Sequence, residues 1–208
     1  MIPIETMTSF FAASLLLAIV PGPDNLFVLT QSALGGKMAG LVVMLGLCTG
    51  LIVHTIAVTF GVAMIFQTST AAFSVLKLLG AAYLLYLSWQ AFNASATKIN
   101  KEKSDEVRMG KLYRRGIIMN ITNPKVSIFF LAFLPQFTDP ARGPISVQMM
   151  LLGAAFILST ILIFGGIAIL AGTLGQWINR SDRAQKYMNK LAGTVFVGLA
   201  LKLATAEI

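Results

Sequence analysis

Apolar residues dominate this chain in six long runs, and a short polar or glycine-rich stretch separates each run from the next. The runs cover about residues 8–31, 39–66, 71–92, 116–135, 145–177 and 191–206. Between them, turns are predicted at residues 34–38, which contain two glycines, and at residues 136–144, which contain two prolines. A helix of roughly 20 apolar residues can cross the roughly 30 Å hydrocarbon layer of a bilayer. The pattern therefore predicts an all-α membrane protein with six transmembrane helices, whereas a β-barrel would need alternating segments of about ten residues.

The composition agrees with a bilayer environment. Of the 208 residues, 56% are hydrophobic and only 12% are charged, while soluble domains carry about a quarter of charged residues. The net charge of +8 comes mainly from basic residues between the apolar runs, without the aromatic and basic pattern of nucleic-acid binding, so no nucleic-acid partner is expected. The single cysteine, Cys48, lies inside a run, which excludes a disulfide framework.

The basic residues also predict an orientation. Successive connections must lie on alternate sides of the membrane, and Lys37, the hydrophilic loop at about residues 93–115 and the link at residues 180–190 all fall on one side. The positive-inside rule makes this side cytoplasmic. Both termini are therefore expected on the opposite side.

The chain is expected to form a single transmembrane domain, residues 1–208, built from two repeats at about residues 1–92 and 116–208. Three helices in each half would place the halves in opposite orientations, which is the inverted repeat common in secondary transporters. A short similarity between residues 77–83 and 190–196 supports the repeat. The basic loop at residues 93–115 would join the two halves in the cytoplasm.

Prolines interrupt the first and the fourth runs, at corresponding places in the two halves. A proline lacks an amide hydrogen and clashes with the carbonyl four residues earlier, so the carbonyls of Leu17, Ile19 and Asn120 lose their helical partners. Freed backbone groups are tolerated in a membrane only where they face protein or a water-filled cavity. Helices one and four are thus expected to be broken beside a translocation path. The positions of the two breaks are Pro21, Gly22, Pro23 and Pro124.

A charged residue follows each break, Asp24 in the first half and Lys125 in the second. The start of a helix carries roughly half a positive charge, which favours Asp24 and makes Lys125 a strong attractant for an anion. Intramembrane charges are costly and mark functional sites. Two hypotheses stay open: a permanent ion pair between Asp24 and Lys125 that joins the halves, or a zwitterionic α-amino acid held between the two charges.

Four further polar residues are candidates for this site. Asn25, Asn120 and Asn123 offer amide groups to the freed carbonyls or to a substrate. His54, the only histidine, is either a second proton carrier or substrate contact, or a neutral side chain bonded to a neighbouring helix. One histidine and one cysteine provide too few soft ligands for a transition-metal path, so neither a metal nor another cofactor is expected.

The motifs around the breaks resemble those of a known family. Residues 21–25, followed by Gly35-Gly36 and Ala39-Gly40, are similar to the signature of the LysE/RhtB family of bacterial amino-acid exporters. Residues 123–125, followed by the segment 129–137, resemble the fourth-span motif of that family. The resemblance covers essentially the whole chain.

The resemblance implies secondary-active efflux of amino acids across the bacterial inner (plasma) membrane by proton antiport, in a multi-pass carrier that is not an enzyme and has periplasmic termini. It carries over Asp24, Asn123, Pro124 and Lys125 as motif positions. Apart from Asp24 the spans hold no acidic residue, which favours small neutral substrates such as threonine, homoserine or leucine. Pairs of glycines at small-xxx-small spacing, Gly36/Gly40 and Gly46/Gly50, predict close helix packing, either inside the chain or in a homodimer.

Two other classes of protein stay open. One is an exporter of cations or metal ions, against which the scarcity of soft ligands argues. The other is a non-transporting structural membrane subunit, which would not need charged breaks. A membrane-embedded enzyme is disfavoured because the sequence has neither an HExxH helix nor a paired acid.

Overall fold

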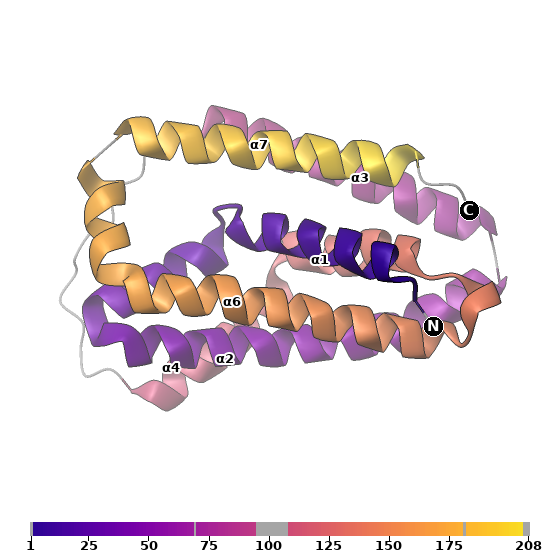
Figure 1. Cartoon of the computed structure of the whole chain (residues 1–208), viewed down its shortest axis with the longest axis horizontal. Coiled ribbons are helices and arrows are strands. Elements are labelled where there is room, and N and C mark those ends of the chain that lie inside the picture. Colours follow the sequence, from indigo (N-terminus) through magenta and orange to yellow (C-terminus); the bar gives the residue numbers. More distant parts are fainter. Residues whose placement is uncertain (1, 69, 95–107, 181, 206–208) are drawn as a thin grey trace.

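The computed structural model describes residues 2–68, 70–94, 108–180 and 182–205. Every regular element in this part of the chain is helical (Figure 1), so the predicted all-α class is confirmed. The elements are α1 (Ile4–Ile19), α2 (Pro23–Thr68), α3 (Thr70–Asn93), α4 (Met109–Thr122), α5 (Pro124–Ile128), the π-helix η1 (Phe129–Phe133), the 3-10 helices η2 (Leu134–Phe137) and η3 (Pro140–Arg142), α6 (Ile145–Arg180) and α7 (Asp182–Thr205).

Within the described residues, three helical segments are long and apolar enough to cross a membrane: Pro23–Gly61, Ser74–Asn93 and Ile145–Ala171. The pair Met109–Thr122 and Pro124–Phe137, bent by 50°, could form a fourth span. A multi-pass helical membrane protein is thereby confirmed. The count stays below the predicted six because α1 has only 16 residues and α7 begins among charged residues.

Two helix boundaries differ from the prediction. α4 begins at Met109, inside the loop predicted at about residues 93–115, of which residues 95–107 lie outside the described part. α7 begins at Asp182 and not near residue 191. In both cases charged side chains continue the helix beyond its apolar run, because helix formation does not require a hydrophobic face once a neighbouring segment is helical.

A kink at Gly36 replaces the turn predicted at residues 34–38. α2 contains 46 residues, and a straight helix of that length would measure about 70 Å, more than twice the thickness of the hydrocarbon layer. Gly36 interrupts it with φ 78°, a backbone conformation that only glycine adopts readily. This single residue separates the short segment after the first break from the long membrane-crossing part of α2.

The long helices pack in pairs: α2 with α6 and α4, α3 with α7, and α1 with α6. Figure 1 shows α3 and α7 side by side, α2, α4 and α6 on the other side of the bundle, and α1 between the two groups. The start of α1 and the end of α7 lie at one end of the bundle, while the starts of α4 and α7 lie at the other (Figure 1).

Glycines permit the close contact between α2 and α4. A Cβ atom at Gly50 would lie 2.6 Å from Asn120 Oδ1, and one at Gly46 would collide with the backbone of Tyr113. The predicted close packing at Gly46 and Gly50 is confirmed. At Gly36, in contrast, an added Cβ atom would meet nothing within 4 Å, so this glycine serves the kink. Because the Gly46 and Gly50 contacts lie within the chain, these glycines no longer argue for a homodimer.

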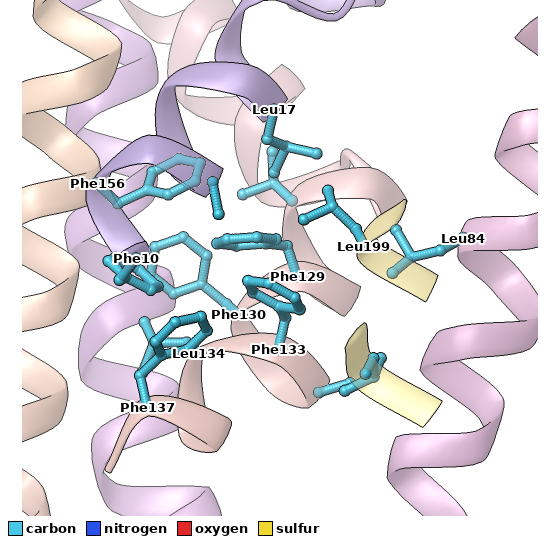
Figure 2. Close-up of a cluster of buried hydrophobic side chains, with 14 of the residues drawn as sticks. Phe10, Leu17, Leu84, Phe129, Phe130, Phe133, Leu134, Phe137, Phe156 and Leu199 are labelled. Atoms are coloured by element: carbon cyan, nitrogen blue, oxygen red, sulfur yellow. The ribbon is translucent and has the colours of Figure 1, made fainter. Parts of the chain in front are cut away.

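Aromatic rings fill the space between α1, η1, η2 and α6, from Leu17 beside the first break to Phe137 (Figure 2). Ring centroids are 4.7 Å apart for Phe129 and Phe133, and 5.1 Å apart for Phe10 and Phe137. Four of the five residues of η1 are buried. Such a π-helical turn is rare and is frequently found at functional sites.

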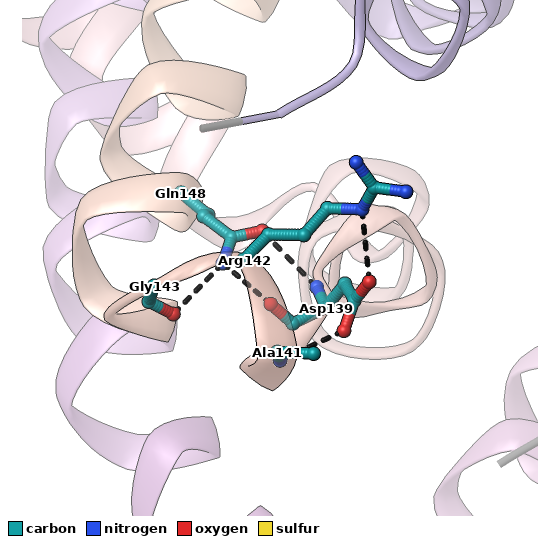
Figure 3. Close-up of polar contacts among 5 residues, drawn as sticks. All are labelled: Asp139, Ala141, Arg142, Gly143 and Gln148. Carbon is teal, nitrogen blue, oxygen red and sulfur yellow. Dashed lines mark hydrogen bonds and ion pairs between the residues drawn. The ribbon is translucent and has the colours of Figure 1, made fainter.

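The turn predicted at residues 136–144 is confirmed, and Asp139 and Gln148 organise it (Figure 3). The Asp139 carboxylate accepts hydrogen bonds from the Ala141 amide and from Arg142 Nε, at 2.9 and 3.0 Å. Gln148 Nε2 donates to the carbonyls of Asp139 and Gly143. These bonds satisfy the backbone of the turn and fix the start of α6.

Candidate functional site

The two proline motifs have the same form in the structure. α1 ends at Ile19 and α2 begins at Pro23, while α4 ends at Thr122 and α5 begins at Pro124. In both places the new helix starts on a proline, whose missing amide hydrogen is harmless at a first helical position. The charged residues Asp24 and Lys125 come next, and both are buried.

Side chains from the opposite half bond to the carbonyls near the breaks. Lys125 Nζ donates to the carbonyls of Val20 and Leu17, at 3.2 and 3.4 Å. His54 Nε2 lies 3.2 Å from the carbonyl oxygen of Asn120. The Leu17 and Asn120 carbonyls, two of those predicted to lose their helical partners, are therefore bonded across the molecule.

Asn123 joins the two charged residues. Its Oδ1 accepts a hydrogen bond from the Lys125 amide at 3.0 Å and thereby caps α5, while its Nδ2 donates to Asp24 Oδ2 at 3.0 Å. Asp24 and Lys125 both lie in the described part of the chain, and no ion pair within 4 Å joins them. Asp24 and Lys125 are thus connected through Asn123 and not through a direct salt bridge.

The close approach of Lys125 explains why a glycine occupies position 22. A Cβ atom on Gly22 would lie 3.3 Å from Lys125 Nζ, tighter than ordinary van der Waals contact. The absence of a side chain between Pro21 and Pro23 therefore gives the ammonium its access to the carbonyls of α1.

A cavity of about 330 Å³ lies where the two breaks meet α3 and α7. Cavities that bind small molecules have volumes of about 300–1,000 Å³. Of the lining residues that the structure describes, Lys125 is the one with a charged side chain, and Asn123 and Gly22 also contribute to the wall. The remaining polar lining residues are Tyr83 and Gln90 of α3 and Asn189 of α7.

The predicted site residues do not all share this cavity. Asp24 lies behind Asn123 and lines a separate cavity of about 20 Å³, to which Lys125 also contributes. Its electrostatic neighbours are Lys125, Asn123, Asn120 and His54. Asn25 points elsewhere and donates from Nδ2 to the Ala18 carbonyl at 2.7 Å.

Sequence reasoning did not select Gln90, Asn189 or Thr160 for the site. The first two line the larger cavity and Thr160 lines the smaller one. No break, charge or motif marks them, since they lie within continuous helices. Only the packing of α3, α6 and α7 against the breaks brings them there.

The structure is thus that of a multi-pass helical membrane protein in which two proline motifs meet at a cavity. The model of the LysE type translocator family matches residues 15–207, and the chain belongs to this family. It is a translocator family, in keeping with transport.

Two relatives extend over nearly the whole chain. A homoserine/homoserine lactone efflux protein of Salmonella typhimurium is 32% identical over 203 residues, covering 98% of each chain. An uncharacterized membrane protein of Vibrio cholerae is 31% identical over 204 residues, again 98% of each. No solved structure matches the chain.

Proposed function

We propose that this protein exports small neutral amino acids, such as threonine, homoserine or leucine, across the bacterial inner membrane in exchange for protons. Membership in a translocator family and similarity to an efflux protein support export of an amino-acid type of solute. The observation that carries the proposal is the cavity of about 330 Å³, which both helix breaks and Lys125 line.

The substrate would bind with its carboxylate at the Lys125 ammonium. Its α-ammonium would face Asn123, which the Asp24 carboxylate holds from behind through the Nδ2 bond of 3.0 Å. Among the described residues, the lining of the cavity contains no acidic side chain, so a cationic side chain on the substrate would find no partner in this part of the wall. This charge pattern favours neutral amino acids over lysine or arginine.

The movement would be alternating access by two inverted repeats within one transporter domain, residues 1–208. The packing supports this arrangement because corresponding helices pack together, α2 with α6 and α3 with α7, and because α1 with α6 mirrors α4 with α2. Six spans would then result if two of them crossed the membrane in a broken form. The first broken span would be α1 with the start of α2, and the second would be α4 with the segment to Phe137. Both termini would lie in the periplasm, with the basic residues inside.

Asp24 would carry the exchanged proton, as the buried carboxylate of the site. His54 would support it indirectly, since its ring bonds to the Asn120 backbone and packs 5.6 Å from the Phe130 ring. The helix breaks would let these groups face either side in turn without exposing backbone to lipid.

Efflux from cells tests the proposal. Cells that overproduce the wild-type chain are loaded with labelled homoserine, threonine or leucine, and the loss of label is followed. We expect faster loss of at least one of them than from cells with the Asp24→Asn variant at equal membrane levels. If the label is lost at equal rates from wild-type and Asp24→Asn cells for each of the three amino acids, the proposal is contradicted.

A further inference from the structure

The small cavity beside Asp24 contains oxygen atoms that lack partners. Asp24 Oδ1 and Asn120 Oδ1 are both buried and accept no hydrogen bond in the structure. Their residues are only 3% and 2% exposed, and both line the cavity of about 20 Å³. Buried polar groups nearly always have a hydrogen-bond partner, and an unsatisfied one calls for a bound water or ion.

The dimensions of this cavity fit one water molecule. A buried water needs roughly 10–15 Å³ of accessible volume and two to four polar partners. Asp24, Asn120, Thr160 and Lys125 all line the cavity and supply that number. Two unpaired acceptors call for a molecule that can donate two hydrogen bonds, which a water does.

Thr160 reaches this cavity from α6, a helix that belongs to neither break. It is 2% exposed, and the other α6 residues of the lining are the aromatic Phe156 and Phe164. Its neighbour Ser159 uses its hydroxyl within the helix and donates to the Ala155 carbonyl at 3.1 Å. The hydroxyl of Thr160 is therefore the α6 group that can form a hydrogen bond with a water beside Asp24.

The two cavities divide the site into compartments. Asp24 lines only the small cavity, Asn123 lines only the large one, and Lys125 lines both. A substrate in the large cavity would meet Lys125 and Asn123, whereas Asp24 would stay in contact with the small cavity. Within the described residues, the titratable groups around Asp24 are Lys125 and His54, and the lining residues from α1 and α6 add none.

We propose that Asp24 exchanges its proton through one water molecule held by Asn120 and Thr160, in a compartment separate from the substrate cavity. The inference rests on the proposed proton-coupled export. The step is a proton transfer only. The O–H bond at Asp24 Oδ1 breaks and a new O–H bond forms on the water. The water then releases one of its protons toward the side of the membrane to which the carrier is open. Thr160 is a positioning residue, because it acts on Asp24 through the water.

Two transport modes separate this role from substrate binding. Net transport driven by a pH gradient requires Asp24 to gain and lose its proton, whereas exchange of labelled for unlabelled substrate at equal pH does not. Thr160→Val keeps the shape and removes the hydroxyl, and Ser159→Ala removes the neighbouring hydroxyl outside the cavity. Thr160→Ser restores the hydroxyl.

In proteoliposomes we expect Thr160→Val to lower pH-driven net transport by about tenfold or more, as for loss of a group that assists proton transfer. Exchange should stay close to the wild-type rate, which also shows that the variant is folded. Ser159→Ala and Thr160→Ser should resemble wild type in both modes. Replacing Na⁺ by choline should change neither mode.

Three results would overturn the inference. The first is equal net transport by Thr160→Val and Ser159→Ala. The second is loss of exchange together with net transport in Thr160→Val, which would assign Thr160 to the substrate or to the fold. The third is a requirement for Na⁺, which would make a metal cation the occupant. A wild-type protein inactive in both modes would instead refute the proposed function itself.

Discussion

Asn123 donates a hydrogen bond of 3.0 Å to Asp24, a residue 99 positions earlier in the chain. The oxygen Oδ1 of the same side chain accepts a hydrogen bond from the Lys125 amide. One amide therefore caps a helix of the second half and holds the carboxylate of the first half. This relationship leads to the first prediction, because the two tasks of Asn123 can be separated.

Asn123→Ser should keep the helix cap and lose the contact with Asp24. Serine is a good N-cap, whereas alanine at such a position costs about 0.5–2 kcal/mol. We expect the serine variant to retain the melting temperature of the wild type in detergent more closely than Asn123→Ala, while both variants lose transport. Full transport by Asn123→Ser would show that Asn123 acts only as a cap.

Lys125→Met should destabilise the fold. The substitution leaves the carbonyls of Leu17 and Val20 without the ammonium and leaves the buried Asp24 without a nearby cation. A buried charge left without compensation costs about 3–5 kcal/mol. We expect a clear drop in thermal stability in detergent, together with loss of transport.

The double variant Asp24→Asn/Lys125→Met should recover most of this stability without recovering transport. It removes both charges, so no uncompensated charge stays buried. The measurement is the melting temperature of both variants under identical conditions. If the double variant melts below Lys125→Met, the two charges are not coupled as the structure indicates.

Ala91→Phe should block the large cavity. Ala91 lines this cavity on α3, whereas Ala82 of the same helix is exposed on the outer surface and provides the control. We expect transport by Ala91→Phe to fall by about tenfold or more, equivalent to about 1.4 kcal/mol, with Ala82→Phe close to wild type. Equal transport by the two variants would remove this cavity from the substrate path.

Gly50→Ala should disturb Asn120 and the α2–α4 contact. The added Cβ would lie 2.6 Å from Asn120 Oδ1, and overpacking of this kind costs about 1–3 kcal/mol. Gly61→Ala on the same helix meets nothing within 4 Å, so it should be neutral or slightly stabilising. Thermal unfolding of both variants distinguishes a close contact from a general effect of glycine replacement.

The sequence predicted the local chemistry of the breaks because proline acts on atoms only four residues away. The loss of partners at Leu17 and Asn120 could be read from Pro21 and Pro124 alone. Which groups replace those partners could not, since Lys125 Nζ and His54 arrive from other helices. The distance between Asp24 and Lys125, with Asn123 between them, likewise depends on how α4 and α5 pack on α1.

Packing also explains what the sequence did not reveal. The π-helical turn at Phe129–Phe133 differs from an α-helix by one hydrogen-bond register, which no composition signal marks. Thr160 and Asn189 lie in uninterrupted helices, so only the three-dimensional arrangement identifies them as lining residues. Conversely, Gly36 took the role of a whole predicted turn because one positive φ angle suffices to kink the chain.

The most direct test of the central claim is transport by the purified protein in proteoliposomes with an imposed pH gradient. Labelled homoserine, threonine and leucine are supplied to vesicles with wild type, Asp24→Asn or Lys125→Met, each at equal protein content. We expect wild type to accumulate at least one of these amino acids against its gradient, collapse of the pH gradient to abolish accumulation, and both variants to fail. Accumulation that persists unchanged in Asp24→Asn and Lys125→Met would contradict the central claim.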